Sequence, residues 1–78
     1  MKLFVRTTTE TVPIEIDPDA SVEDIKTKLA TKTGIPVIKQ KLMFAGKILG
    51  NSAKVSALEG VSEGTVIDLV ILGISGTI

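Results

Sequence analysis

The sequence of 78 residues contains no cysteine, histidine, tryptophan or tyrosine. Without cysteine the chain can form neither a disulfide nor a thiolate metal site, and without histidine it lacks the commonest metal ligand and general base. It has no glycine-rich phosphate loop, and we expect no apolar pocket around the carboxylates Glu15, Asp17 and Asp19 that would raise a pKa as catalytic acids require. The sequence therefore predicts no catalytic residue, no metal site, no cofactor and no enzymatic activity.

Neither sign of charge dominates, because nine Lys and Arg residues balance nine Asp and Glu residues. Proteins that bind nucleic acid or anionic membranes rely on a positive field, and single strands also need aromatic stacking platforms. The apolar runs are much shorter than the ~20 residues that span a bilayer, and no signal-peptide pattern opens the chain. We expect a soluble protein of the cytoplasm or nucleus that binds neither nucleic acid nor membrane.

What the sequence does contain is a regular order of short apolar segments. Apolar and polar residues alternate over residues 1–6 and again over 11–17, which is typical of two half-buried strands. The polar residues 7–10 between them predict a turn, so the two strands form a hairpin. Pro13 has no N–H to donate, and this places the second strand at the margin of the sheet.

A helix is predicted to begin at Ser21 and to stop at Gly34. Ser21 followed by Asp24 is a typical N-cap pattern, and the Ile35-Pro36 pair prevents the helix from continuing. The spacing of the apolar residues i, i+3 and i+7 gives an amphipathic helix that covers one side of a sheet. Its apolar face contains Val22, Ile25 and Leu29, and the other faces contain Glu23, Lys26, Thr27 and Lys28.

The second half of the chain predicts three further strands. Residues 42–44 form the first, Ala45-Gly46 a tight turn, and residues 47–49 a short edge strand. A turn-rich segment with one 3₁₀ turn follows, anchored by Val55, Leu58 and Val61. Residues 65–72 are rich in β-branched side chains and predict a long central strand. This order predicts an α+β fold with one helix on one face of a mixed sheet.

Four blocks of sequence carry a resemblance to a known family. They are FVRT at residues 4–7, GIP at 34–36, LMFAGK at 42–47 and EGTVIDLVI at 63–71. In their order and spacing the chain resembles ubiquitin and the integral ubiquitin-like domains of shuttle proteins. The resemblance implies a β-grasp fold, with a mixed sheet of about five strands packed on one α-helix. It covers residues 1–72 as one domain and leaves residues 73–78 as a tail.

The resemblance also implies a protein-binding patch on the sheet face opposite the helix. Carried over by position, the patch consists of Met43 at its centre, Val70, Thr8, Asp68, Gly46 and Lys47. Ubiquitin has a leucine at the position of Thr8 and a histidine at that of Asp68, so we expect a smaller patch with a negative charge. The partners implied are ubiquitin-binding domains and proteasome subunits, and those with a cation opposite Asp68 should be favoured. Alternatively, Met43 is a partly covered residue with a structural role, as singly exposed apolar residues often are.

The tail decides between two functions. Conjugated members of the family end in a flexible tail with two adjacent glycines preceded by arginines, whereas this chain ends in GISGTI. The expectation is therefore a binding domain that is not conjugated. The alternative is a protein modifier joined to its targets through Gly76 after Thr77 and Ile78 are removed. Because apolar residues are costly to expose, we expect the tail to pack, to form a weak dimer of an otherwise monomeric chain, or to continue into residues absent here.

Overall fold

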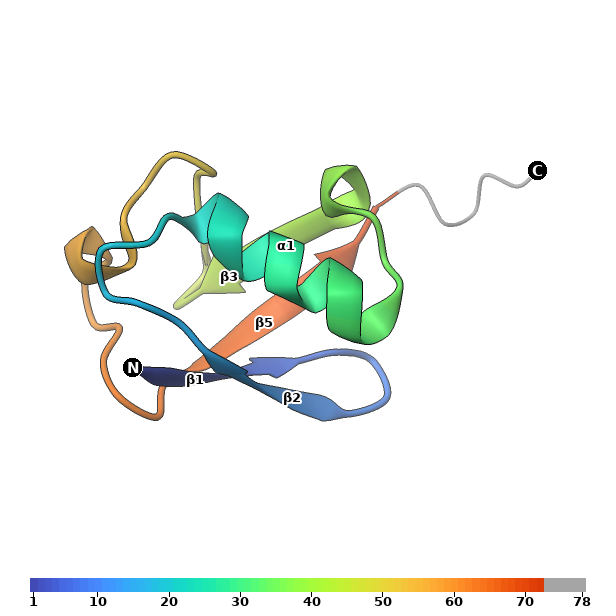
Figure 1. The fold of residues 1–78 in the computed structure, drawn as a ribbon, viewed down its shortest axis with the longest axis horizontal. Helices are drawn as coiled ribbons and strands as arrows, with labels where there is room; N and C mark the ends of the chain where they lie inside the picture. Colours follow the sequence, from blue (N-terminus) through green and yellow to red (C-terminus); the bar gives the residue numbers. More distant parts are fainter. Residues whose placement is uncertain (73–78) are drawn as a thin grey trace.

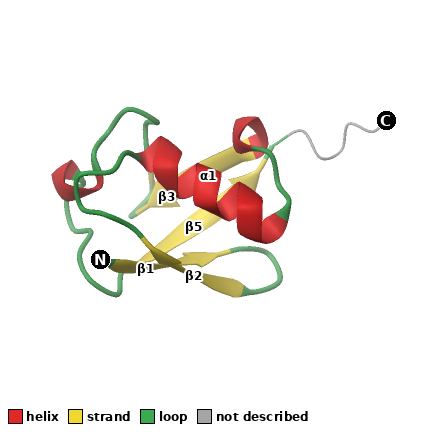
Figure 2. Cartoon of the chain, viewed as in Figure 1, coloured by secondary structure: helices red, strands yellow, loops and turns green. Residues whose placement is uncertain are grey.

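The structure of the protein is a computed structural model that describes residues 1–72. Five strands form one mixed sheet in the order β2-β1-β5-β3-β4, and one helix lies across one of its faces (Figure 1). The strands are β1 (Lys2–Arg6), β2 (Thr11–Glu15), β3 (Gln40–Phe44), β4 (Lys47–Ile48) and β5 (Val66–Ile71). The helix is α1 (Val22–Thr33), and two 3₁₀ turns, η1 (Val37–Lys39) and η2 (Val55–Ala57), lie in the connections (Figure 2). This arrangement confirms the predicted α+β class.

Strand β5 lies at the centre of the sheet. It pairs parallel with β1 and antiparallel with β3, so the two ends of the domain meet in the middle of the sheet. Within residues 1–72 the hairpin partner β2 pairs with no strand other than β1 and is an edge strand. Pro13 lies on this edge strand, as predicted, where a missing N–H is tolerated.

Local signals set both ends of α1. The Ser21 hydroxyl accepts a hydrogen bond from the Asp24 backbone N–H at 3.3 Å, and the Asp24 carboxylate accepts one from the Ser21 N–H at 3.0 Å. This reciprocal capping box satisfies N–H groups that have no partner within the helix. At the other end Gly34 adopts the left-handed conformation, with φ of 79°, and its N–H bonds to the Ala30 carbonyl. The predicted start and stop of the helix are confirmed.

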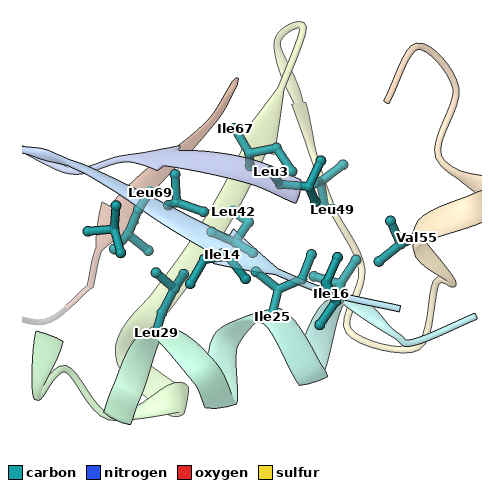
Figure 3. Packing of buried hydrophobic residues seen from close by; sticks show 13 residues of the cluster. Leu3, Ile14, Ile16, Ile25, Leu29, Leu42, Leu49, Val55, Ile67 and Leu69 are labelled. Carbon is teal, nitrogen blue, oxygen red and sulfur yellow. The ribbon is translucent and has the colours of Figure 1, made fainter. Parts of the chain in front are cut away.

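The hydrophobic core lies between α1 and one face of the sheet (Figure 3). Val22, Ile25 and Leu29 of the helix are fully buried against side chains from four strands. Those strand residues are Leu3, Val5, Val12, Ile14, Leu42, Ile67 and Leu69. The predicted core positions on the helix and on β5 are therefore confirmed.

One helix position differs from the prediction. Lys26 was expected outside the apolar face, but its side chain is only 7% exposed. The reason is helical spacing, since position 26 lies four residues after Val22 and three before Leu29 and so borders the buried stripe. The aliphatic part of the lysine is covered, and its Nζ donates to the Asn51 side-chain oxygen at 2.6 Å.

Within residues 1–72 no helix is both long enough and apolar enough to cross a membrane.

Candidate functional site

The face of the sheet opposite α1 is where the predicted patch lies. Along β3 and β5, Leu42, Ile67 and Leu69 point into the core, so the residues between them project from the opposite face. We call this second surface the open face. Residues that pair across adjacent strands project on the same side, and Met43 pairs with both Asp68 and Ile48.

Met43 is partly exposed on the open face and has apolar neighbours. Ile48, on β4, is 60% exposed, and Val70, on β5, is 40% exposed. Val70 pairs with Lys41, two residues along the strands from the Met43–Asp68 pair. The strands therefore bring Met43, Val70 and Asp68 onto one surface, and they add Ile48 to it.

Asp68 has a cationic partner within the chain. The parallel register of β1 and β5 places Arg6 opposite Asp68. The Arg6 Nε donates to Asp68 Oδ1 at 2.8 Å, and an Nη of the same guanidinium lies 2.8 Å from that oxygen. The negative charge expected at the rim of the patch is thus balanced by the guanidinium beside it.

The other predicted patch residues lie in two turns. Gly46, with φ of 80°, and Ala45, with φ of 54°, form the tight turn between β3 and β4, and Lys47 is exposed at the start of β4. Thr8 is exposed in the β1–β2 loop, where it lines a groove of about 210 Å³ beside Ile71 and the C-terminal end of α1. The structure thus assigns Thr8 to that groove. Gly76 lies outside the described residues.

Sequence reasoning missed two features of this surface. Ile48 was predicted to lie on an edge strand, but the face of the sheet on which it projects was not predicted. A two-residue turn at Ala45-Gly46 pairs Ile48 with Met43, and this pairing could have placed both side chains on one face. A groove of about 490 Å³ begins at Ile48 and runs between the β3–β4 turn and the segment after η2. Phe44, Leu58 and Gly60 are among the residues that line it. This groove is not apparent from the sequence because its two walls are separated along the chain.

Within residues 1–72 no three acidic residues cluster as metal ligands would. Glu15 is instead paired with the Met1 ammonium, whose nitrogen lies 2.9 Å from Glu15 Oε2. That hydrogen bond lowers the pKa of Glu15 below its ordinary 4.5 and raises the pKa of the Met1 ammonium above its ordinary 8.0. The pair joins the start of β1 to the end of β2.

A mixed five-stranded sheet that holds one helix on one face and leaves the other open defines the β-grasp class. The chain belongs to the ubiquitin family, whose family model matches residues 3–72. The predicted family and fold are therefore confirmed.

Relatives of two kinds resemble the chain. It is 36% identical over 72 residues to the ubiquitin-like protein NEDD8 of Dictyostelium discoideum, covering 91% of this chain and 92% of that protein. It is 35% identical over 74 residues to ubiquitin-like protein 1 of Schizosaccharomyces pombe, covering 91% of each. It is also 31% identical over 72 residues to the protein DNA-DAMAGE INDUCIBLE 1 of Arabidopsis thaliana. That match covers 91% of this chain and spans only 17% of the Arabidopsis protein.

Proposed function

We propose that this chain is a non-catalytic protein-interaction domain that other proteins recognise through its open face. The partners are ubiquitin-binding domains or proteasome subunits, and binding takes place in the cytoplasm or the nucleus. The observation that supports this is the grouping of Met43, Val70 and Ile48 on the sheet face that α1 leaves uncovered. Exposed apolar side chains gathered on one face are more typical of a binding surface than singly scattered ones.

The charges on the same face support protein recognition. Asp68 is paired with Arg6, so a partner can cover Met43 without burying a lone carboxylate. Lys41 pairs with Val70, so a lysine borders the apolar residues on this face. A polar rim around an apolar centre is the usual anatomy of a protein interface.

Within this proposal the domain is not conjugated to other proteins. The alternative is a protein modifier attached through Gly76 after Thr77 and Ile78 are removed. Its support is the similarity over nearly full length to two short relatives that carry the name ubiquitin-like protein. The resemblance to one segment of the much longer Arabidopsis protein supports the first function instead.

The binding function is tested with a purified ubiquitin-binding helix titrated into ¹⁵N-labelled protein. We expect chemical-shift changes at Met43 and Val70, and Met43→Ala should weaken binding at least about tenfold, since truncating a central interface residue often costs about 2 kcal/mol. Ile38→Ala is the matched control, because Ile38 is 84% exposed on η1. Shifts confined to other surfaces, or equal affinity of the Met43→Ala variant, would rule the proposal out.

The modifier function is tested separately. The purified chain and a version that ends at Gly76 are incubated with cell lysate and ATP, and mass spectrometry is used to search for a thioester or an isopeptide through Gly76. An adduct would replace the binding-domain proposal with a modifier that matures by proteolysis. Its absence from both forms would reject the modifier.

Sedimentation of the full chain and of residues 1–72 tests the predicted monomer or weak dimer in the same preparations.

A further inference from the structure

Asn51 is the only asparagine in the sequence, and an ammonium group holds its side chain. The Lys26 Nζ donates to Asn51 Oδ1 at 2.6 Å. Because an ammonium donates hydrogen bonds and accepts none, the amide oxygen and not the amide nitrogen faces it. Within residues 1–72 neither the Asn51 Nδ2 nor the backbone N–H of Ser52 donates a hydrogen bond. The amide is therefore polarised at its oxygen, while its nitrogen and the next backbone nitrogen are not held.

The backbone around Asn51 is fixed in a turn. The Ala53 N–H bonds to the Gly50 carbonyl at 3.1 Å, and the Glu23 N–H bonds to the Asn51 carbonyl, also at 3.1 Å. Asn51 is exposed, so water reaches its amide, whereas the Lys26 side chain is only 7% exposed. Solvent screens a cation less when it is partly buried, so Lys26 acts on the amide carbonyl more strongly than a surface lysine would.

These features favour loss of the side-chain amide of Asn51 as ammonia. The backbone nitrogen of the following residue attacks the side-chain Cγ and closes a five-membered ring. This attack is intramolecular, so proximity lowers its barrier. Negative charge develops on Oδ1 during the attack, and a donor that is already in place at such an oxygen stabilises the transition state. The Lys26 Nζ lies at that oxygen before the reaction begins.

We propose that Asn51 is a self-modification site, at which Lys26 promotes conversion of the side-chain amide to a carboxylate. The Ser52 nitrogen gives its proton to water and forms a bond to the Asn51 Cγ, and the Cγ–Nδ2 bond then breaks. The leaving nitrogen takes up a proton from solvent and departs as ammonia. One water molecule then opens the succinimide ring to give aspartate or isoaspartate. The whole conversion consumes one water, releases one ammonia and involves no oxidation.

The aspartate product strengthens the contact with Lys26. It keeps an oxygen within reach of the Lys26 Nζ and adds a negative charge, so a neutral hydrogen bond becomes a charge-assisted one. The formal net charge of the chain, zero before the reaction, becomes negative by one unit. The isoaspartate product instead routes the backbone through Cγ and displaces the carbonyl that the Glu23 N–H uses. The folded contacts therefore fit aspartate, and the converted chain is more stable than the newly made one.

The experiment follows the purified full chain at neutral pH and physiological temperature by mass spectrometry with peptide mapping. Assignment is direct, because the only other side-chain amide is that of Gln40. Rates are measured for the folded wild type, for wild type unfolded in guanidinium chloride, and for three variants. Lys26→Gln removes the ammonium, and Ser52→Pro removes the attacking N–H. Lys28→Gln is the matched control, since it makes the same change at an exposed lysine of α1. Spectral dispersion gives the folded fraction of each variant.

We expect folded wild type to lose ammonia from Asn51 at least about tenfold faster than Lys26→Gln, since removing one donor from a developing oxyanion slows enclosed reactions by roughly 10²–10³. Lys28→Gln should react like wild type, Ser52→Pro should not react, and the unfolded chain should react more slowly than the folded one. The unfolded rate also corrects for any partial unfolding of Lys26→Gln. Equal rates for wild type and Lys26→Gln, or an unfolded chain that reacts as fast as the folded one, would overturn the role of Lys26.

The product provides an independent check. After incubation, wild type should unfold at a higher guanidinium midpoint than before, and this midpoint should equal that of Asn51→Asp. Ammonia loss that continues in Ser52→Pro would overturn the attack by the backbone nitrogen. A converted chain with a midpoint no higher than that of newly made wild type would overturn the proposed strengthening of the Lys26 contact.

Discussion

At the scale of single residues, Arg6 changes what Asp68 presents to a partner. Asp68 projects from the open face next to Met43, and its carboxylate is held by the guanidinium of Arg6. The two side chains are 63% and 49% exposed. Exposed ion pairs contribute about 1 kcal/mol or less to stability, so the pair matters more for recognition than for folding.

Replacing Arg6 with Gln should therefore weaken binding more than stability. The free energy of unfolding, measured with urea, should change by less than ~1 kcal/mol. Affinity for an apolar partner should fall about tenfold, because covering an unpaired carboxylate costs roughly 1–3 kcal/mol. The double variant Arg6→Gln/Asp68→Asn removes both charges and should bind like wild type. If the single variant retains wild-type affinity, the pairing has no role in recognition.

Lys26 provides a second residue-scale prediction. Its Nζ donates to a neutral amide oxygen, that of Asn51, in a part-buried hydrogen bond. Asn51→Asp would replace this partner with a carboxylate, and a charge-assisted hydrogen bond is about twice as strong as a neutral one. We expect the free energy of unfolding to rise by ~1 kcal/mol, and Asn51→Ala to lower it by ~1–3 kcal/mol because the ammonium loses its partner. Urea unfolding measures both, and an Asp variant less stable than wild type would contradict the argument.

At the scale of secondary-structure elements, the first strand is joined to the second at both ends. Near the loop, the Thr7 N–H bonds to the Glu10 carbonyl at 2.7 Å. At the other end the Met1 ammonium donates to Glu15 Oε2 and to the Ile16 carbonyl, each at 2.9 Å. The edge strand β2 pairs with no strand except β1 among the described residues, so these links help to hold it in register.

The Met1–Glu15 pair predicts a pH dependence with two limbs. The pKa of Glu15 is lowered, so its contribution is present above about 4.5 and is lost as the pH falls through the depressed value. The pKa of the Met1 ammonium is raised, so its contribution is present below about 8.0 and is lost as the pH rises through the raised value. Urea midpoints measured across this range should fall at both ends. Glu15→Gln should reduce the fall of the urea midpoint at both low and high pH. Identical pH profiles for the variant and wild type would exclude this pair as the cause.

The elements that sequence could predict are those set by local chemistry. Ser21, Asp24 and Gly34 define α1 through bonds within a few residues, and Pro13 identifies an edge strand by its missing N–H. The Arg6–Asp68 pair could not be predicted, because it depends on the register of two strands about sixty residues apart. The groove at Ile48 could not be predicted either, because its second wall is the segment after η2, which meets Ile48 only in the folded chain. Met43 and Val70 were placed by the resemblance and by the alternation of β3 and β5.

At the scale of the whole molecule, folding and recognition use opposite faces of one sheet. The core face packs against α1, and the open face carries the proposed binding residues. A domain of this size has a small core and a stability of only about 5–15 kcal/mol, so each large core residue is a substantial part of the total. The open face can therefore vary with little effect on folding, whereas the core face cannot.

This separation is tested by comparing Leu29→Ala with Met43→Ala. Leu29 is fully buried between α1 and the sheet, and its truncation should lower the free energy of unfolding by ~2–5 kcal/mol through lost burial and a cavity. Met43 is only partly buried, so its truncation should cost ~1 kcal/mol or less by the same argument. The affinity for a partner should fall more in Met43→Ala, which removes a contact, than in Leu29→Ala, which reduces only the folded fraction. If Leu29→Ala weakens binding as much as Met43→Ala does, under conditions where both variants are fully folded, the core packing shapes the open face directly. Folding and recognition would then be coupled.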